Sequence, residues 1–459
     1  LSHMLQTDPE GWGRISGPGV QAAHLVAWLG FAFTHALVWP IFAAVANRFR
    51  GTRLLSPWAA LVLPAAWVLG EFVRALVTSI VFWGEGGLIG PYWNLGAFGF
   101  AASGTPAVFS GRFVGLAGLS FLVVAVNVFL FWLLLRRWRA ALIGLCSVVA
   151  VATLGWLAYR TPDGAETKVG IVHMNSTDPI NETALRGYVA SHQPFGDLNV
   201  LVLPEYSGLY TETSQTGAQE PLESFAFGNR SGLVIAAGYG RGDDSNRVGQ
   251  IGYYADDQTI SLQQKRFLIP AGEYLPESIA SVIKLSDSPI LLPRYNEARK
   301  VTPGRQPERP VTYSGRTYGT LSCSGVLTPQ FYRSLTKQGA EILVNPTSLI
   351  IFADSRAFSD QNRQMARYQA VANARPFIQS ARGASSFVLD HNGRTVQQSR
   401  ADLEIAAATV SSNRTPTAYT LVGEWVVPAS AVILVWWFLN IHRSSRRRGG
   451  RRKRTTQTD

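Results

Sequence analysis

Three reactive side chains follow three apolar segments of this chain. Cys323 lies in Gly-Thr-Leu-Ser-Cys-Ser-Gly-Val, Glu205 ends Leu-Val-Leu-Pro-Glu, and Lys265 begins Lys-Arg-Phe-Leu-Ile-Pro-Ala-Gly-Glu-Tyr-Leu-Pro. A thiol attacks well only as a thiolate, so it needs a base that takes its proton or a cation that stabilises its charge. Glu205 can supply the base and Lys265 the cation. The three residues together indicate a cysteine nucleophile and acyl transfer through a thioester.

The order of these segments resembles the carbon–nitrogen hydrolase (nitrilase) superfamily, whose glutamate, lysine and cysteine follow one another in this order. The segment from Lys265 to Pro276 is similar to the lysine segment of the apolipoprotein N-acyltransferase family, and the resemblance covers nearly the whole chain. It implies an α-β-β-α sandwich whose active-site residues, Glu205, Lys265 and Cys323, lie at strand ends. It also implies a supporting carboxylate at Glu273, which orients Lys265.

Two departures from that family pattern lie near the cysteine. The family usually follows its cysteine with an aromatic residue and a glutamate, whereas this chain has Ser324 and Gly325. The missing glutamate removes a charge that should help to hold the site, so Glu273 or another group must compensate, or activity is reduced. The segment after Asn345 is also unusual, because it ends in Leu-Ile-Ile-Phe352. We expect this apolar stretch to act as a lipid-facing lid.

The chain divides into hydrophobic and polar regions. Four apolar stretches, at about 22–47, 57–81, 114–135 and 140–159, occupy residues 22–160, and a fifth occupies 417–441. Each is close to the roughly 20 residues that cross a ~30 Å hydrocarbon layer. Strand-like and helical patterns alternate within 167–411, which is typical of an α/β domain. We therefore expect a membrane α-helical bundle plus an α/β nitrilase-like sandwich domain at 167–411.

The remaining segments lie at the ends of the chain and between two of the apolar stretches. Residues 1–21 are expected to form an outer N-terminal segment, and their start, Leu-Ser-His-Met, suggests a cloning remnant or a truncation. Residues 442–459 form a basic tail, which carries much of the net charge of +12. Residues 82–113 are rich in aromatic residues and glycine. There, Trp83 and Trp93 are candidates for substrate contact, together with Phe352 from the predicted lid.

Arginine placement predicts the orientation in the membrane. Arginines follow the first apolar stretch, separate the third from the fourth, and fill the tail after the fifth. All three clusters can be cytoplasmic only if the chain crosses the membrane at every stretch. Residues 82–113 and the 167–411 domain then lie outside. We expect a multi-pass protein of the bacterial plasma (inner) membrane with its catalytic domain on the outer, periplasmic face.

Several other features limit the alternatives. The second cysteine, Cys146, lies in an apolar stretch, so a disulfide scaffold is excluded, and no metal-ligand spacing or cofactor motif is present. A basic tail directly after a membrane helix indicates contact with anionic lipid, not with nucleic acid. Glu71 and Arg74 lie three residues apart in one apolar stretch, where a mutual or interhelical ion pair is expected. Residues 390–394 are typical of a hairpin turn.

The resemblance implies a glycerophospholipid as acyl donor and the N-terminal diacylglyceryl-cysteine amine of a lipoprotein as acceptor. Two alternatives remain open. A membrane-tethered amidase would use water to release the acyl group from a small amide. A catalytically impaired homologue would act as a binding or scaffold protein, which the altered residues after Cys323 favour.

Overall fold

A computed structural model describes most of the chain: residues 18–49, 56–175, 198–207, 232–241, 246–255, 258–285, 292–293, 295–296, 300–352, 355–403 and 405–455. Residues 1–17 of the expected N-terminal segment and residues 456–459 of the tail lie outside these ranges.

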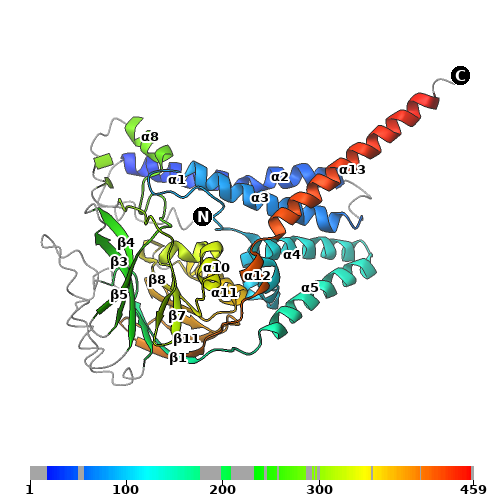
Figure 1. Cartoon of the computed structure of the whole chain (residues 1–459). Coiled ribbons are helices and arrows are strands. Elements are labelled where there is room, and N and C mark those ends of the chain that lie inside the picture. Colours follow the sequence, from blue (N-terminus) through cyan, green and yellow to red (C-terminus); the bar gives the residue numbers. More distant parts are fainter. Residues whose placement is uncertain are drawn as a thin grey trace.

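The apolar stretches form long helices that pack together beside the sheets (Figure 1). Four candidate membrane spans occur among the described residues, and a shorter apolar helix covers Val426–Asn440. Large apolar side chains such as Leu134, Ile143 and Val432 are exposed on the bundle, as hydrocarbon surroundings would require. The helices are α1 (Pro18–Ala36), α2 (Val38–Ala46), α3 (Ala59–Val81), α4 (Gly111–Leu134), α5 (Trp138–Ala158) and α13 (Val426–Thr455).

The long helices extend away from the sheets, so the loops between them lie either at the end of the bundle near the sheets or at the end far from them (Figure 1). Residues 47–49 at the start of the α2–α3 connection, the α4–α5 connection and the end of α13 lie at the end of the bundle farther from the sheets. Arg48, Arg136 and Arg137 belong to those connections. The link from α3 to α4 lies at the end near the sheets and contains η4 (Phe98–Gly104) and η5 (Pro106–Ser110).

One twelve-stranded sheet folds back on itself to make two facing halves. The first half contains β5 (Gln258–Gln264), β4 (Arg247–Ala255), β3 (Leu233–Arg241), β2 (Val200–Val202), β1 (Glu166–Met174) and β12 (Ile405–Ser411). The second contains β6 (Val311–Tyr313), β7 (Arg316–Thr320), β8 (Ile342–Ser348), β9 (Phe377–Arg382), β10 (Ser386–Leu389) and β11 (Thr395–Ser399). The parallel pairing of His173 with Ala381 joins them. A common core between the halves includes Ile171 and Val202 from one and Val344 and Ile378 from the other.

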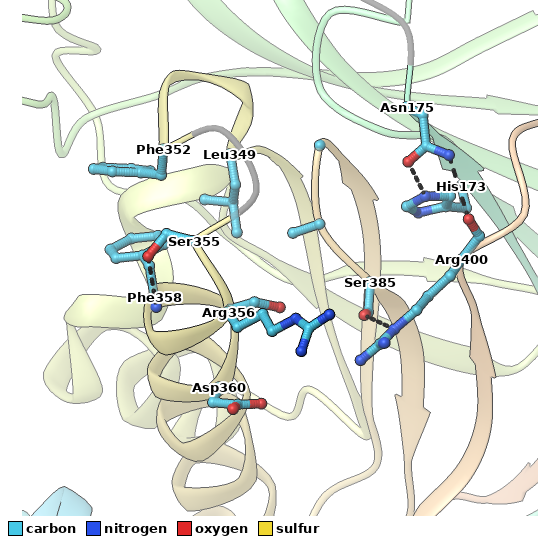
Figure 2. A pocket seen from close by; sticks show the side chains of 13 residues that line it. His173, Asn175, Leu349, Phe352, Ser355, Arg356, Phe358, Asp360, Ser385 and Arg400 are labelled. Atoms are coloured by element: carbon cyan, nitrogen blue, oxygen red, sulfur yellow. Dashed lines mark hydrogen bonds between the residues drawn. The ribbon is translucent and has the colours of Figure 1, made fainter. Parts of the chain in front are cut away.

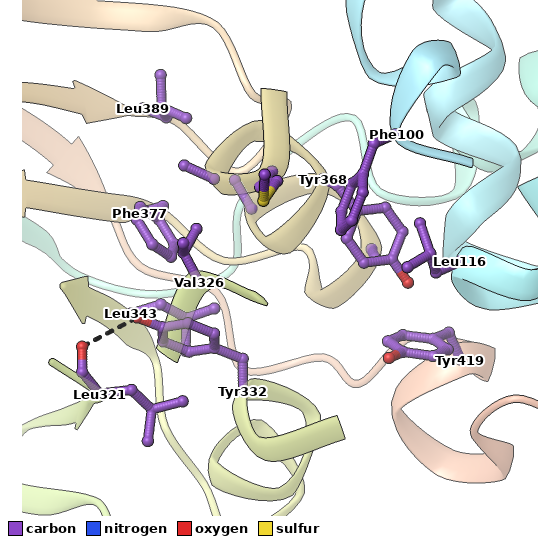
Figure 3. Close-up of a cluster of buried hydrophobic side chains, with 14 of the residues drawn as sticks. Phe100, Leu116, Leu321, Val326, Tyr332, Leu343, Tyr368, Phe377, Leu389 and Tyr419 are labelled. Atoms are coloured by element: carbon purple, nitrogen blue, oxygen red, sulfur yellow. Dashed lines mark hydrogen bonds between the residues drawn. The ribbon is translucent and has the colours of Figure 1, made fainter. Parts of the chain in front are cut away.

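A helical layer covers the second half and connects it to the membrane helices. Helices α10 (Pro329–Lys337) and α11 (Arg356–Asn373) contribute Tyr332 and Tyr368 to a buried cluster that also contains Phe100, Leu116 and Tyr419 (Figure 3). Tyr419 belongs to α12 (Ala418–Val422). On the other side, α8 (Glu277–Leu285) packs against α1. The segments 176–197 and 208–231, which flank β2, lie outside the described residues.

Arg112, at the start of α4, ties three parts of the protein together. Its guanidinium donates to the carbonyl oxygens of Val371 (3.1 Å), Gly155 (2.9 Å) and His391 (2.8 Å), and to Asn392 Oδ1 (2.9 Å). The side chain is fully buried, so each of these acceptors would lose its partner if the guanidinium were removed. The sandwich domain is therefore fastened to α4 and α5 by a polar contact as well as by apolar packing.

We expect Arg112→Met to destabilise the protein strongly, because an unpaired buried polar group costs about 1–3 kcal/mol and several would be created at once. Thermal unfolding of the full chain in detergent measures the effect. Arg139→Met removes an exposed arginine from α5 and serves as the control. Equal unfolding temperatures for the two variants would contradict this role of Arg112.

Candidate active site

The three residues predicted to form a triad lie at the same edge of the folded sheet. Strands β1, β2 and β3 are parallel, as are β7, β8 and β9, so their carboxyl ends point the same way. Glu205 follows β2 and Cys323 follows β7. Lys265 directly follows β5, which is antiparallel to β4 as β4 is to β3 and therefore runs parallel to β3. The strand directions thus bring residues from three distant segments together.

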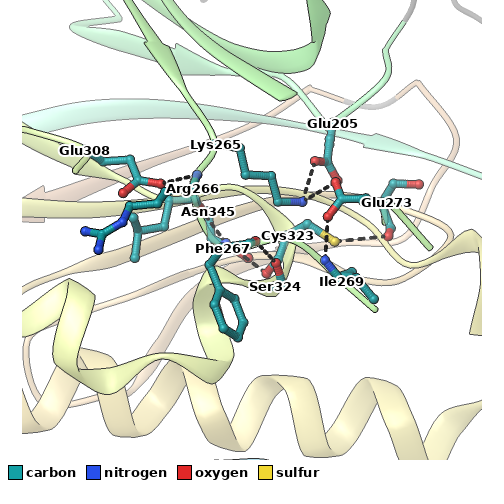
Figure 4. Close-up of polar contacts among 12 residues, drawn as sticks. Glu205, Lys265, Arg266, Phe267, Ile269, Glu273, Glu308, Cys323, Ser324 and Asn345 are labelled. Carbon is teal, nitrogen blue, oxygen red and sulfur yellow. Dashed lines mark hydrogen bonds and ion pairs between the residues drawn. The ribbon is translucent and has the colours of Figure 1, made fainter. Parts of the chain in front are cut away.

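Lys265 is held between two carboxylates inside the protein (Figure 4). Its Nζ lies 2.7 Å from Glu273 Oε1 and 3.5 Å from Glu205 Oε1. The other oxygen of Glu273 accepts a hydrogen bond of 2.8 Å from the Ile269 amide, which fixes that carboxylate. Lys265, Glu205 and Glu273 are 3%, 2% and 5% exposed, so water cannot screen their charges. The second carboxylate that the resemblance implied thus contacts the lysine directly.

Cys323 begins a short 3₁₀ helix, η7 (Cys323–Leu327), with a left-handed backbone φ of 44°. A positive φ is uncommon for a residue with a side chain and occurs often at functional sites. The thiol lies 3.6 Å from the carbonyl oxygen of Ser348, to which it donates. Asn345, which the sequence did not single out as a site residue, donates to the carbonyl of Leu321 (2.6 Å) and holds the turn before the cysteine. The sequence feature that could have indicated this role is a side-chain amide that directly follows the apolar residues at the start of strand β8.

The surroundings set the charge of each group. Burial and the negative charge of Glu205 raise the pKa of the Cys323 thiol to about 12, although Lys265 opposes the rise. Burial also raises the pKa of Glu205, although Lys265 offsets part of this effect. Burial alone would lower the pKa of Lys265, but the two carboxylates raise it above its usual value. At neutral pH the resting site therefore contains a neutral thiol beside a charged ammonium.

The residues after Cys323 fit the close packing of η7. Ser324 Oγ donates to the carbonyl oxygen of Phe267 (2.8 Å), which joins the cysteine segment to the lysine segment. A Cβ atom placed on Gly325 would lie 2.3 Å from Leu321 Cβ. No side chain fits there unless Leu321 moves, so a glutamate at this position would have to displace Leu321.

The three residues predicted to contact substrate lie in different surroundings. Trp83 is 48% exposed, whereas Trp93 is 7% exposed and packs its ring 4.8 Å from that of Phe267. Phe352 stacks on Phe358 at 3.8 Å and lines a cavity of about 540 Å³ (Figure 2). Leu349 lines the same cavity and directly follows Ser348, whose carbonyl faces the thiol. The predicted apolar lid thus lies beside the site, and substrate contact by these side chains stays a prediction.

The ion pair expected between Glu71 and Arg74 is wrong. Neither side chain forms an ion pair with any described residue, and each hydrogen-bonds the backbone of the α3–α4 link instead. The hairpin predicted at 390–394 is confirmed, since β10 and β11 pair on either side of it. Among the residues that the structure describes, no three His, Cys, Asp or Glu side chains gather as a metal ion would require.

Comparison with known families identifies the class of protein. The family model described as carbon-nitrogen hydrolase matches residues 183–419. That range covers more than half of the chain, includes all four clustered residues and contains most of the folded sheet. The chain belongs to the carbon-nitrogen hydrolase family, and the predicted nitrilase-like fold is confirmed.

Within this class, the chain is similar over most of its length to proteins named apolipoprotein N-acyltransferase. The protein from Gloeobacter violaceus is 24% identical, with 89% of this chain and 80% of the relative covered. The protein from Pasteurella multocida is 21% identical, with 92% and 81% covered. A carbon-nitrogen hydrolase crystal structure from Helicobacter pylori covers 60% of this chain and 95% of its own, at 17% identity and a TM-score of 0.41.

The charges around the thiol lead to a prediction with opposite signs for two variants. Removing the negative charge in Glu205→Gln should lower the thiol pKa and speed alkylation of Cys323 near neutral pH. Removing the positive charge in Lys265→Met should raise the pKa and slow alkylation. The pH dependence of iodoacetamide alkylation, followed by mass spectrometry, gives the pKa of the Cys323 thiol in each variant. In a Cys146→Ala background Cys323 is the only thiol. Shifts in the same direction would rule out this electrostatic picture.

Proposed function

We propose that the protein is a membrane-bound N-acyltransferase that transfers a fatty acyl chain from a glycerophospholipid to the N-terminal diacylglyceryl-cysteine amine of a lipoprotein. The observation that carries this proposal is the buried cluster of Glu205, Lys265, Glu273 and Cys323 in a domain packed on apolar helices. Similarity to apolipoprotein N-acyltransferases across both parts of the chain supports the same assignment. Both substrates are lipids, which explains why a catalytic domain would be fastened to a membrane bundle.

The first half-reaction forms the thioester. Glu205 takes the proton from Cys323 while the sulfur attacks the ester carbonyl carbon of the phospholipid. The carbonyl oxygen becomes an oxyanion, and Lys265 stabilises it, because an ammonium has three N–H donors and the two carboxylates use only two of them. The carbon–oxygen bond then breaks. The departing lysophospholipid oxygen takes the proton from Glu205, and the acyl group stays on sulfur.

The second half-reaction uses the same groups in reverse. The lipoprotein amine attacks the thioester carbonyl, and Glu205 takes a proton from the attacking nitrogen. Collapse of the tetrahedral intermediate breaks the carbon–sulfur bond, and Glu205 returns the proton to Cys323. Because Cys323 is only 8% exposed, the thioester is shielded from water and has time to meet an amine. This burial favours acyl transfer over the hydrolysis that an amidase would carry out.

The orientation that we propose places the sandwich domain on the periplasmic face. Arg136 and Arg137 occupy the α4–α5 connection, far from the sheets, and basic residues concentrate in the C-terminal part of α13 (Figure 1). Basic connections remain in the cytoplasm. A periplasmic domain would also have access to lipoproteins after their export.

Incubation with phospholipid should add one fatty-acyl mass to Cys323, and neutral hydroxylamine should remove it, because hydroxylamine cleaves thioesters. Intact-mass analysis of the full chain measures both steps. Cys323→Ala should remain unmodified, whereas Cys146→Ala, which changes an exposed cysteine of α5, should be acylated normally. Equal acylation of Cys323→Ala would exclude Cys323 as the nucleophile. An adduct that water discharges as fast as an amine would favour the amidase.

Cysteine labelling in sealed cells tests the orientation. In a background with both native cysteines changed to alanine, Gln306→Cys on the exposed surface of the sandwich domain should react with an impermeant maleimide. Gln457→Cys in the basic tail should react only after the membrane is permeabilised. The reverse pattern would overturn the proposed topology.

A further inference from the structure

The link between α3 and α4 contacts both catalytic segments through residues 91–98, which we call the bridging segment. The ring of Trp93 lies 4.8 Å from that of Phe267, two residues after Lys265. The side-chain amide of Asn94 donates to the carbonyl oxygen of Leu327 (3.4 Å), the last residue of η7. The bridging segment therefore packs against the chain just after the lysine and against the short helix that begins with the cysteine.

Both contacts lie next to residues of the candidate active site. The carbonyl oxygen of Phe267 accepts the 2.8 Å hydrogen bond from Ser324, the neighbour of Cys323. Phe267 is only 4% exposed, so its ring is fixed between the bridging segment and the sandwich domain. Displacement of Trp93 would shift Phe267 and change the separation of Lys265 from the thiol.

Three ionisable side chains of the membrane helices hold the bridging segment. Arg74 Nη1 donates to the carbonyl oxygen of Leu95 (2.9 Å), and His35 Nε2 lies 3.0 Å from the same oxygen. Glu71 Oε1 accepts a hydrogen bond of 2.7 Å from the Phe98 amide. His35 Nδ1 also lies 2.8 Å from the carbonyl oxygen of Phe31, and a neutral imidazole has only one N–H to donate. Arg74 is therefore the permanent donor to the bridging segment.

Burial of ionisable side chains within an apolar helix costs free energy, so their presence indicates a role in the protein. Glu71 and Arg74 are 8% and 3% exposed within α3, one of the candidate membrane spans. Charged groups in a membrane segment are expensive and mark functional positions more often than structural ones. Gly96 has a φ of 76°, and a Cβ atom there would lie 3.0 Å from Arg74 Nη1. The backbone of the bridging segment thus approaches the guanidinium as closely as a glycine allows.

We propose that Glu71 and Arg74 are positioning residues for acyl transfer, which act through the bridging segment to fix the distance between Lys265 and Cys323. This inference rests on the proposed function for the reaction that it serves. The two charges bind the bridging segment, Trp93 carries the constraint to Phe267, and Asn94 carries it to η7. The active-site geometry is accordingly set in part from within the membrane helices.

The test compares variants of the full chain in phospholipid nanodiscs, all in the Cys146→Ala background. Arg74→Gln removes the cation, Arg74→Lys retains it, and Trp93→Leu breaks the link to Phe267. Glu424→Gln is the matched control, because Glu424 is a partly buried carboxylate that also accepts backbone amides of a membrane helix, from Leu116 (3.0 Å) and Ala117 (2.9 Å). Each variant is measured for thermal unfolding, single-turnover thioester formation and the pH midpoint of Cys323 alkylation.

Arg74→Gln and Trp93→Leu should slow thioester formation at saturating phospholipid roughly ten- to a hundredfold, since small misplacements of reacting groups have effects of this size. Both should also shift the alkylation midpoint. Arg74→Gln should leave the half-saturating phospholipid concentration unchanged, and Arg74→Lys should restore most of the loss. Glu424→Gln should lower the unfolding temperature alone.

A lower unfolding temperature for Arg74→Gln with an unchanged rate and midpoint would overturn the proposal. If Arg74→Gln does not fold, Trp93→Leu decides, and a normal rate and midpoint in that variant would also overturn it. If the parent protein forms no thioester, the proposed function fails, but the alkylation midpoints still decide whether Arg74 sets the geometry around Cys323.

Discussion

The Lys265 ammonium is buried, so its charge must be balanced where water cannot reach it. Glu273, at 2.7 Å, is its close partner, and Glu205, at 3.5 Å, is the looser one. Two carboxylates around one ammonium leave an excess negative charge, and a thiolate would add a second. Burial and this negative charge raise the pKa of the Cys323 thiol and keep it protonated at rest. In the mechanism that we propose, a proton therefore leaves Cys323 for Glu205 as sulfur attacks, and this requirement sets what the surrounding elements have to provide.

The fold provides this arrangement by bringing the ends of β2, β5 and β7 together and by leaving space for the aliphatic part of the Lys265 side chain. The Lys265 amide donates to the carbonyl oxygen of Gly249 (2.7 Å), and a Cβ atom on Gly249 would lie 2.9 Å from Lys265 Cβ. Only glycine allows β4 to approach so closely. On the other side of the site, Ser324 and Asn345 hold the cysteine turn by hydrogen bonds to backbone carbonyls. Rigid donors of this kind keep the sulfur near the ammonium without adding charge.

The sequence predicted the parts that depend on local pattern and on ordered motifs. Apolar stretches of membrane-spanning length gave α3, α4 and α5 to within a few residues, and residues 390–394 gave the hairpin between β10 and β11. Segment order predicted the residues that the structure brings together around Lys265, although their catalytic roles remain proposals. Contacts between segments far apart in the chain could not be predicted from local pattern or motif order. The spacing of Glu71 and Arg74 suggested a pair, but both side chains hydrogen-bond the backbone of the α3–α4 link, whose course the sequence does not specify. The Trp93–Phe267 contact joins residues far apart in the chain and has no local signature.

The departure after Cys323 follows from the same balance of packing and charge. Gly325 has no space for a side chain, because Leu321 occupies the position that a Cβ atom would need, and Leu321 itself belongs to the cluster that joins the sandwich domain to the α3–α4 link. A glutamate could enter only by displacing part of the contact between the domain and the membrane helices. It would also bring another carboxylate close to a site that already has two for one ammonium, and so would make the thiolate harder to form. Serine and glycine in this place keep η7 compact, and Ser324 uses its hydroxyl to join the cysteine segment to Phe267. The unusual sequence is therefore consistent with an active site whose geometry relies on its contact with the membrane helices more than on an additional charge.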